Sequence, residues 1–304
     1  MAFRDPDIAA FKEQMAAMTA FRAAEPVSFE EERAQFDAFH GAMPPAEDCV
    51  IEPIVVDGVR GERISPKGAD TSRALLYHHG GGHTFGSSLS HRHLVSRLAA
   101  AAGVVAFNMD YRLAPEHPYP AGLDDAVATY RYVLDQGFTA DRIIVGGESA
   151  GGNLTTALLL KLRELGLPLP AGAYLLSPWL DMTLGGKSYE ARAPHDPLIT
   201  RAALDRCVAA YVGAGTAVDD PLVSPIKADL AGLPPLFLQV GTDELFLSDS
   251  TTFADRAALA GIDVELHVWA EMVHAWPLFH LALPVSGPAA IAEAGAWIAR
   301  RLAR

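Results

Sequence analysis

The stretch Arg142-Ile-Ile-Val-Gly-Gly-Glu-Ser-Ala-Gly-Gly-Asn153 decides how the chain is organised. Its β-branched residues 143–145 predict a buried strand, and the small and apolar residues from Ala150 onward predict a helix. Between them, Gly147 and Gly151 flank Ser149 in a Gly-x-Ser-x-Gly pattern. Glycine is needed at both positions because a Cβ there would collide with the neighbouring backbone of a sharp strand-to-helix turn. The stretch therefore predicts a nucleophilic serine exposed on that turn.

A glycine-rich turn between a strand and a helix can instead bind a phosphate group at the helix N-terminus. The spacing here is neither Gly-x-x-x-x-Gly-Lys-Ser/Thr nor Gly-x-Gly-x-x-Gly, which are the patterns of nucleotide-binding turns. Phosphate binding is therefore only the alternative interpretation of this turn.

The composition is typical of a globular protein with a large core, since 50% of the 304 residues are hydrophobic and 20% are charged. A net charge of −13 without a Lys/Arg block disfavours nucleic acids and anionic membrane surfaces as partners. The two cysteines, Cys49 and Cys207, lie far apart and predict a reducing compartment without a disulfide framework. The chain has no apolar leader pattern and no run of about 18 apolar residues, so we expect a cytoplasmic location.

Strands alternate with helices along most of the chain, which predicts an α/β fold with a doubly wound, mostly parallel sheet. The predicted strands are residues 51–56, 61–65, 74–78, 104–109, 142–145, 173–176, 236–240 and 264–269. The predicted helices are residues 91–102, 122–136, 150–165, 248–260 and 288–301. Turn residues bound the first three strands, which indicates an antiparallel start to the sheet.

Two segments fall outside this alternation. Residues 1–45 carry apolar side chains at three- and four-residue steps, typical of amphipathic helices that cover a surface or form a lid over an apolar site. Residues 181–233 carry turn residues and one helix-like stretch at 200–211. We therefore expect one catalytic domain, residues 46–304, covered by a helical cap built from residues 1–45 and 181–233.

A serine hydroxyl needs a base that removes its proton and an acid that orients the base. Downstream of Ser149, one predicted strand runs into Asp243 and Glu244, and the next runs into His274. Both loops follow the carboxyl end of a strand, where open α/β sheets bind their ligands. We expect Ser149, Asp243 and His274 to be the catalytic residues, with Glu244 as the main alternative to Asp243.

Negative charge that develops during attack by this serine needs backbone N–H donors. Residues 77–83, Tyr-His-His-Gly-Gly-Gly-His, place three glycines at the end of a predicted strand. Glycines let the backbone bend close to a ligand without a side chain in the way. We therefore expect an oxyanion hole formed by the N–H groups of Gly81, Gly82 and Ala150.

A metal centre is the alternative use of the histidines in this region, with His79 and His83, or His91 and His93, as ligands. No Asp, Glu or Cys clusters with them in the sequence, and the serine apparatus is complete without a metal. We expect neither a metal ion nor a cofactor.

With His-Gly-Gly-Gly at residues 79–82, Gly-x-Ser-x-Gly at 147–151, then Asp243 and His274, the chain resembles the hormone-sensitive-lipase-like (family IV) branch of bacterial esterases. The segment Asp110-Tyr-Arg-Leu-Ala-Pro-Glu116 looks like a Tyr-Arg-Leu-Ala-Pro-Glu stretch of that family. The resemblance implies an α/β-hydrolase fold, with a mostly parallel eight-stranded sheet, helices on both faces and a helical cap.

The resemblance also implies hydrolysis of short- to medium-chain carboxylic esters by a Ser-His-Asp acyl-enzyme mechanism, without a cofactor. Homodimers are common in the family. Arg112 and Glu116 would hold a loop near the oxyanion turn. The chain departs from the family at Glu148, where relatives usually carry Asp, so the hydrogen bonds of this carboxylate must be rearranged.

The substrate pocket is less well defined by the sequence. Apolar residues beside the motif loops or in the cap are its candidates: Phe85, Trp179, Leu198, Ile199, Phe246, Val273 and Trp276. Each is equally typical of a core position. Lactone hydrolysis with the same triad, amide hydrolysis, and a non-catalytic small-molecule receptor remain alternatives, although such receptors usually lack the base that His274 provides here.

Overall fold

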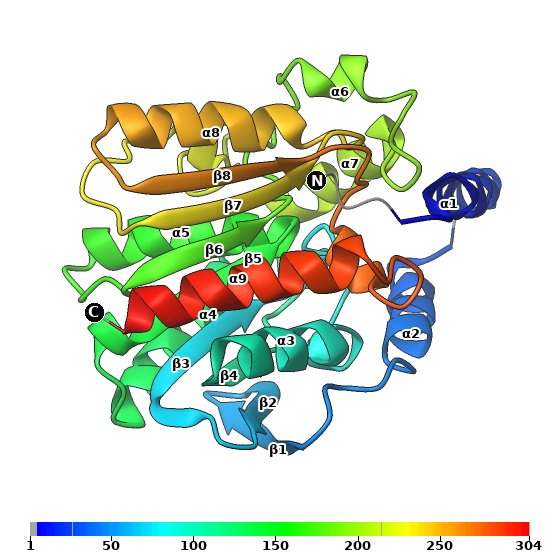
Figure 1. Cartoon of the computed structure of the whole chain (residues 1–304). Helices are drawn as coiled ribbons and strands as arrows, with labels where there is room; N and C mark the ends of the chain where they lie inside the picture. The colour runs from blue at the N-terminus through cyan, green and yellow to red at the C-terminus, as the bar shows by residue number, and fades with distance from the viewer. Residues whose placement is uncertain (1–4, 26, 214, 304) are drawn as a thin grey trace.

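An eight-stranded sheet forms the centre of the computed structural model, which describes residues 5–25, 27–213 and 215–303 (Figure 1). The strand order is β1-β2-β4-β3-β5-β6-β7-β8. Strand β2 is antiparallel to β1 and β4, and every other neighbouring pair is parallel. The predicted mostly parallel eight-stranded sheet is confirmed. The expected antiparallel start is correct only for β1 and β2, because β3 pairs in parallel with both β4 and β5.

The strands are β1 (Cys49–Val56), β2 (Val59–Pro66), β3 (Asp70–His78), β4 (Val104–Met109), β5 (Ile143–Glu148), β6 (Gly172–Leu176), β7 (Leu236–Gly241) and β8 (Val264–Trp269). The helices are α1 (Ile8–Ala24), α2 (Phe29–His40), α3 (Ser88–Ala102), α4 (Ala121–Asp135), α5 (Ala150–Glu164), α6 (Ser188–Ala191), α7 (Arg201–Val212), α8 (Leu247–Leu259) and α9 (Ser286–Leu302). Short 3₁₀ helices are η1 (Ala140–Arg142), η2 (Pro225–Lys227) and η3 (Trp276–Phe279). Helix α3 begins three residues earlier than predicted because Ser87 and Ser90 form a capping box.

Helices cover both faces of the sheet. Helices α4, α5 and α8 pack into one core cluster and α3 and α9 into the other, with the sheet between them (Figure 1). Strands β4, β5, β6 and β7 are buried along their whole length. Burial on both faces is typical of parallel strands and explains their continuous apolar sequences.

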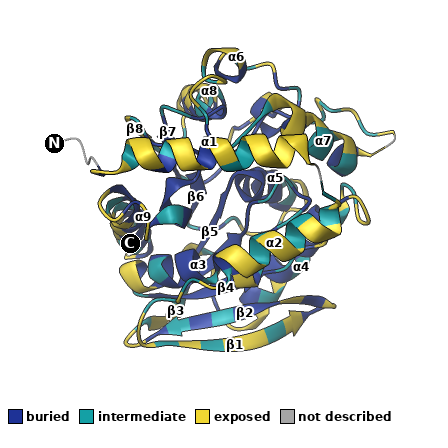
Figure 2. Cartoon of the chain, turned by 90° about the vertical axis from the view of Figure 1, so that its right-hand side faces the viewer, coloured by how far each residue is buried: buried dark blue, intermediate teal, exposed yellow. Residues whose placement is uncertain are grey.

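The remaining helices lie across the carboxyl ends of the parallel strands, where α1 and α2 cross in front of the sheet (Figure 2). The two segments predicted to form the cap, residues 1–45 and 181–233, contact each other. Thr19 Oγ1 donates to Pro197 O at 2.8 Å, and Arg206 of α7 contacts Glu32 of α2 at 2.9 Å. Of the predicted cap segments, residues 1–4, 26 and 214 lie outside the described part of the chain.

Over the described ranges, the chain contains no helix with the length and apolar character needed to cross a membrane.

Candidate active site

The turn after β5 holds Ser149 in a backbone conformation that residues other than glycine rarely adopt. Ser149 has φ 56° and ψ −123°, and its N–H donates to Leu176 O at 3.0 Å. A Cβ at Gly147 would lie 2.4 Å from Gly151 O, and a Cβ at Gly151 would lie 2.0 Å from His78 O. Both distances are far below van der Waals contact, so the two glycines of Gly-x-Ser-x-Gly are sterically required, and the strained serine is of the kind found at functional sites.

The loops after β7 and β8 bring a carboxylate to a histidine. His274 Nδ1 donates to Glu244 Oε2 at 2.9 Å, and the Glu244 side chain is fully buried. The other oxygen, Glu244 Oε1, accepts from Ser177 Oγ at 2.7 Å and from Gly241 N at 2.6 Å. These bonds fix the carboxylate so that it holds the ring of His274 in one orientation and one tautomer.

The predicted acid, Asp243, does not contact the histidine; the structure places Glu244, the alternative named in the sequence, there instead. Asp243 Oδ2 pairs with Lys12 Nζ of α1 at 2.6 Å, and Asp243 Oδ1 accepts from Thr242 Oγ1 at 3.0 Å. These two adjacent side chains point in different directions. Glu244 therefore turns inward to His274, whereas Asp243 turns outward to α1.

Burial and charge shift the pKa of His274 in opposite directions. Burial lowers the pKa of His274, but the hydrogen bond and the charge of Glu244 outweigh it, so the pKa is raised above its ordinary value. A base with a raised pKa accepts a proton more readily, which suits a group that removes a hydroxyl proton.

Four neighbouring strands supply the residues of this site. Ser149 follows β5, Ser177 follows β6, Glu244 follows β7 and His274 follows β8, and these strands are adjacent in that order. These four strands form a row with Ser149 at one end and His274 at the other. The buried aromatic rings of Trp179 and Phe246 connect the two ends. Trp179 N donates to Ser149 O at 3.0 Å, Trp179 stacks on Phe246 at 5.6 Å, and Phe246 meets the His274 ring edge-on at 5.0 Å.

The glycine turn after β3 is tightly folded beside this row. Gly81 O accepts hydrogen bonds from the N–H groups of Thr84 and Phe85, both at 2.9 Å. Gly81 and Gly82 have φ values of 110° and 60°, which favour glycine. A Cβ at Gly81 would lie 2.1 Å from Phe85 O. Consecutive glycines are therefore needed for the turn to close on itself.

Glu148, the residue before Ser149, connects the serine turn and the glycine turn. Its carboxylate accepts from the Gly80 N–H and from Tyr77 Oη at 2.7 Å, and it forms an ion pair with His91 Nε2 at 2.7 Å. The extra methylene of Glu relative to Asp thus places the carboxylate between β3, the glycine turn and α3. This explains the departure from the family pattern noted in the sequence.

Glu148 and His91 form a buried ion pair. Burial raises the pKa of Glu148, but the charge and hydrogen bond of His91 outweigh it and lower the pKa overall. Burial lowers the pKa of His91, and the charge and hydrogen bond of Glu148 outweigh that effect and raise it. Both shifts favour ionised Glu148 beside protonated His91, a pair whose disruption leaves an uncompensated buried charge.

The candidate pocket residues divide into three groups. Val273 and Trp276 are fully buried in the core cluster that contains α3 and α9, so the structure places them in the core. Trp179 and Phe246 are buried but border Ser149 and His274, as described above. The third group is half-buried and lies in the glycine turn or in residues 181–233: Phe85, Leu198 and Ile199.

Several residues of the site were missed by the sequence interpretation. Ser177 had a detectable signal, since it is a polar residue directly after a predicted buried strand. Lys12 and His91 had none, because their partners Asp243 and Glu148 lie 231 and 57 positions away. Contacts of that kind arise only from the tertiary fold.

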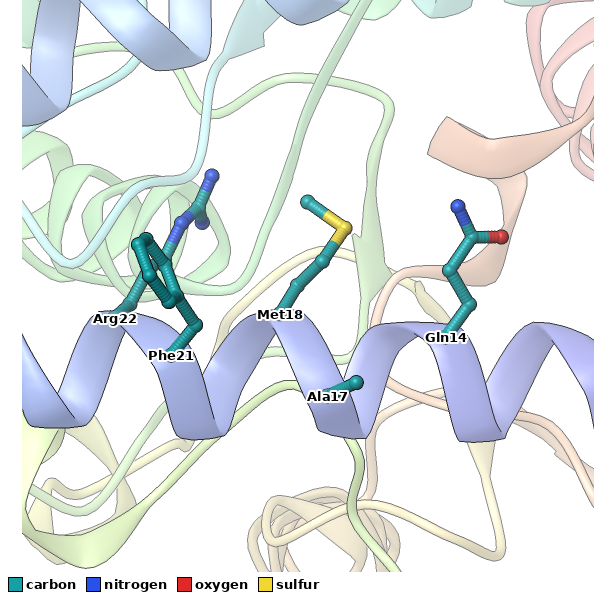
Figure 3. A pocket seen from close by; sticks show the side chains of 5 residues that line it. All are labelled: Gln14, Ala17, Met18, Phe21 and Arg22. Atoms are coloured by element: carbon teal, nitrogen blue, oxygen red, sulfur yellow. The ribbon is translucent and has the colours of Figure 1, made fainter.

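Among the described residues, no three or more His, Cys, Asp or Glu side chains are grouped so that they could hold a metal ion. A separate surface pocket is lined by α1 residues on one helical face, with Met18 and Phe21 beside Gln14, Ala17 and Arg22 (Figure 3). This pocket contains none of the residues of the serine site.

Comparisons with known proteins agree with the fold. Residues 75–278 match the model of a family described by its alpha/beta hydrolase fold. An acetyl-hydrolase of Streptomyces hygroscopicus is 42% identical over 245 residues, 81% of each chain, and an esterase of Acinetobacter venetianus is 38% identical over 235 residues, 77% of each.

Solved structures are similar over nearly the whole chain. A crystal structure of an esterase from the bacterial hormone-sensitive lipase family has a TM-score of 0.91 at 40% identity, covering 99% of this chain and 100% of that one. A structure of the protein EstE5, soaked with p-nitrophenyl butyrate, has a TM-score of 0.92 at 37% identity with the same coverage.

The fold and the serine turn, together with these relatives, define a serine carboxylic-ester hydrolase. Within that class, the chain belongs to the α/β-hydrolase family and to its hormone-sensitive-lipase-like (family IV) branch of esterases.

Proposed function

We propose that this esterase hydrolyses short- to medium-chain carboxylic esters through an acyl-enzyme on Ser149, with His274 as base and Glu244 as its orienting acid. The observation that carries the proposal is the 2.9 Å contact between His274 Nδ1 and buried Glu244, on the row of strands that ends in Ser149. The triad is thus Ser-His-Glu in place of the Ser-His-Asp expected from the sequence, an accepted variant in α/β-hydrolases.

In the first step, His274 Nε2 takes the Ser149 proton while Oγ attacks the ester carbonyl carbon. Collapse of the tetrahedral intermediate breaks the bond to the alcohol oxygen, and His274 returns the proton to that oxygen. In the second step, water attacks the acyl-enzyme with the same proton transfers, so that acid is released and Ser149 is regenerated.

The N–H groups of Gly81, Gly82 and Ala150 are the proposed oxyanion donors. Support comes from the described part of the chain, where these three amides have no acceptor within the protein. Ala150 also lies at the first position of α5, where a helix N-terminus presents free N–H groups and favours negative charge. Developing charge on the substrate oxygen would therefore meet donors that need no rearrangement.

The cap is proposed to consist of residues 1–45 and 181–233. The contacts of Thr19 with Pro197 and of Arg206 with Glu32 support one unit made of both segments. The burial of Trp179 and Phe246 beside His274 favours a small acyl group. The acetyl-hydrolase among the relatives, and the butyryl ester used with EstE5, point in the same direction.

A p-nitrophenyl ester series from acetate to palmitate tests this proposal, with Ser149→Ala as the blank. We expect kcat/KM to be highest between acetate and hexanoate and to fall for longer chains. A maximum at palmitate would contradict the proposed chain length. Matched lactones and anilides belong in the same series, and a lactone turned over faster than every open ester would replace the proposed substrate class.

A further inference from the structure

Arg33, on helix α2, contacts the glycine turn from outside the catalytic domain. Its Nε donates to Thr84 O at 2.7 Å, and its Nη2 donates to Ala114 O at 2.8 Å. Two further bonds run from its guanidinium to the carboxylate of Glu116, at 3.1 and 2.6 Å. One side chain thus connects α2 to two loops that are about thirty residues apart in the sequence.

The two loops are themselves joined at this point. Ala114 N donates to His83 O at 2.9 Å, so the glycine turn and the loop after β4 share a backbone hydrogen bond. Arg33 accordingly donates to one carbonyl on each of the two joined loops, Thr84 O and Ala114 O. The hydrogen bond from Arg33 lowers the pKa of Glu116, which indicates a charge-assisted contact. Glu116 therefore holds Arg33, while Arg33 holds the carbonyls.

Helix α7 contacts the same turn from another side. Cys207 Sγ lies 3.7 Å from Thr84 Oγ1, and a Cβ at Gly82 would lie 2.6 Å from Cys207 Sγ. Thr84 is therefore contacted by α2 through its carbonyl and by α7 through its hydroxyl. A turn made of consecutive glycines has little conformational preference of its own. Its geometry must be set by the groups that hold it.

We propose that Arg33 is a positioning residue for ester hydrolysis, which fixes the Gly81–Gly82 turn through Thr84 O and thereby aims the oxyanion donors. This inference rests on the proposed role of that turn as the oxyanion hole. Arg33 does not touch the reacting atoms. Its loss loosens donors that act mainly on the transition state, so it lowers kcat more than it changes KM.

The test measures kcat and KM with p-nitrophenyl butyrate for Arg33→Ala and Arg33→Lys. Loss of an oxyanion donor lowers kcat by about 100-fold or more, so a displaced donor should have a smaller effect, roughly tenfold in Arg33→Ala. KM should stay within about twofold of the original. Lys lacks the planar fork that binds two carbonyls and a carboxylate together, so Arg33→Lys should recover only part of the rate.

A second readout separates positioning from folding. The rate of inactivation by a fluorophosphonate, whose phosphoryl oxygen uses the same donors, should fall by the same factor as kcat. Arg206→Ala is the matched control, because Arg206 also joins α7 to α2, through Glu32, Val27 O and the ring of Phe29, without contacting the glycine turn. Both rates should stay near the original in that variant.

Equal losses in Arg33→Ala and Arg206→Ala would overturn the inference, because any weakening of the cap would then explain the effect. A rise in KM at unchanged kcat would overturn it as well, since that outcome indicates ground-state binding. Ser149→Ala is assayed alongside. If that variant kept its turnover, the proposed function itself would fail, whereas an inactive Ser149→Ala with a fully active Arg33→Ala would reject only the role of Arg33.

Discussion

His274 Nδ1 lies 2.9 Å from Glu244 Oε2, and the neighbouring carboxylate of Asp243 lies 2.6 Å from Lys12 Nζ. Two adjacent acids on one loop thus have separate partners: Glu244 contacts the proposed catalytic base, His274, and Asp243 contacts α1. This division makes the two residues distinguishable by mutation.

Glu244→Gln should reduce kcat for p-nitrophenyl butyrate by about 10⁴-fold. The amide cannot stabilise the imidazolium and favours the wrong tautomer, as in comparable acid-to-amide changes of other serine hydrolases. Asp243→Asn should change kcat by less than about threefold, because it weakens only a partly exposed ion pair with Lys12. Steady-state kinetics of the two variants check this, and the reverse order of effects would restore Asp243 as the acid.

The acid limb of the kcat/KM profile should have its midpoint above pH 6.5. His274 must be neutral to act as a base, and the bond to Glu244 outweighs burial and raises its pKa. Activity should therefore be lost as pH falls through this raised value. Glu244→Gln, assayed at higher enzyme concentration, should move the midpoint to lower pH, and Asp243→Asn should leave it in place. If Asp243→Asn moved the midpoint of the acid limb and Glu244→Gln did not, the assignment of Glu244 as the orienting acid would be contradicted.

Glu148→Gln should lower the free energy of unfolding by roughly 3–5 kcal/mol, because it leaves protonated His91 buried without its counter-charge. Activity should fall too, since the Gly80 N–H loses a charged acceptor. Urea unfolding followed by circular dichroism measures the first effect. Glu265→Gln is the matched control, because its ion pair with Arg300 is solvent-exposed and should contribute less than about 1 kcal/mol. Equal losses of unfolding free energy in both variants would mean that the buried pair contributes no more to stability than the exposed pair.

Stability should fall as pH drops below 6.5, because burial depresses the pKa of three histidines between α2, α3 and η3. Burial, the largest cause, lowers the pKa of His93 to about 2, of His40 to about 3 and of His280 to about 4. Between 6.5 and these values the unfolded chain binds protons that the folded chain does not, so protonation favours unfolding.

His93→Leu should remove one of these contributions. The loss of unfolding free energy between pH 6.5 and 5.0 should shrink by up to about 2 kcal/mol, at 1.36 kcal/mol for each pH unit. His195→Leu serves as the control for the loss of an exposed histidine. Urea midpoints at the two pH values check this. An unchanged pH dependence in His93→Leu would contradict the effect of burial.

The sequence predicted the elements of the sheet and the serine turn because their signals are local. Gly147, Ser149 and Gly151 stand within five consecutive residues between a recognisable strand and a recognisable helix, and His274 follows the end of a recognisable strand. The choice between Asp243 and Glu244 was not predictable in this way. It depends on which side of one loop faces β6, where Ser177 binds Glu244, and on Lys12, which lies 231 positions away from Asp243.

The apolar candidates show the same limit. Large apolar residues such as Val273 and Trp276 are typical both of pocket walls and of core positions. Only their packing in the cluster that contains α3 and α9 shows that they belong to the core. Glu148 was recognisable as a departure from the family pattern. Its partners Tyr77 and His91 become neighbours only when β3, β5 and α3 are assembled.

Covalent labelling of the serine turn shows directly whether Ser149 is the nucleophile. Intact protein is treated with a fluorophosphonate and digested, and the modified residue is identified by tandem mass spectrometry. We expect one phosphonyl adduct on Ser149, formed in parallel with the loss of esterase activity and absent from both Ser149→Ala and His274→Ala. An adduct on another residue, or undiminished turnover by Ser149→Ala, would contradict it.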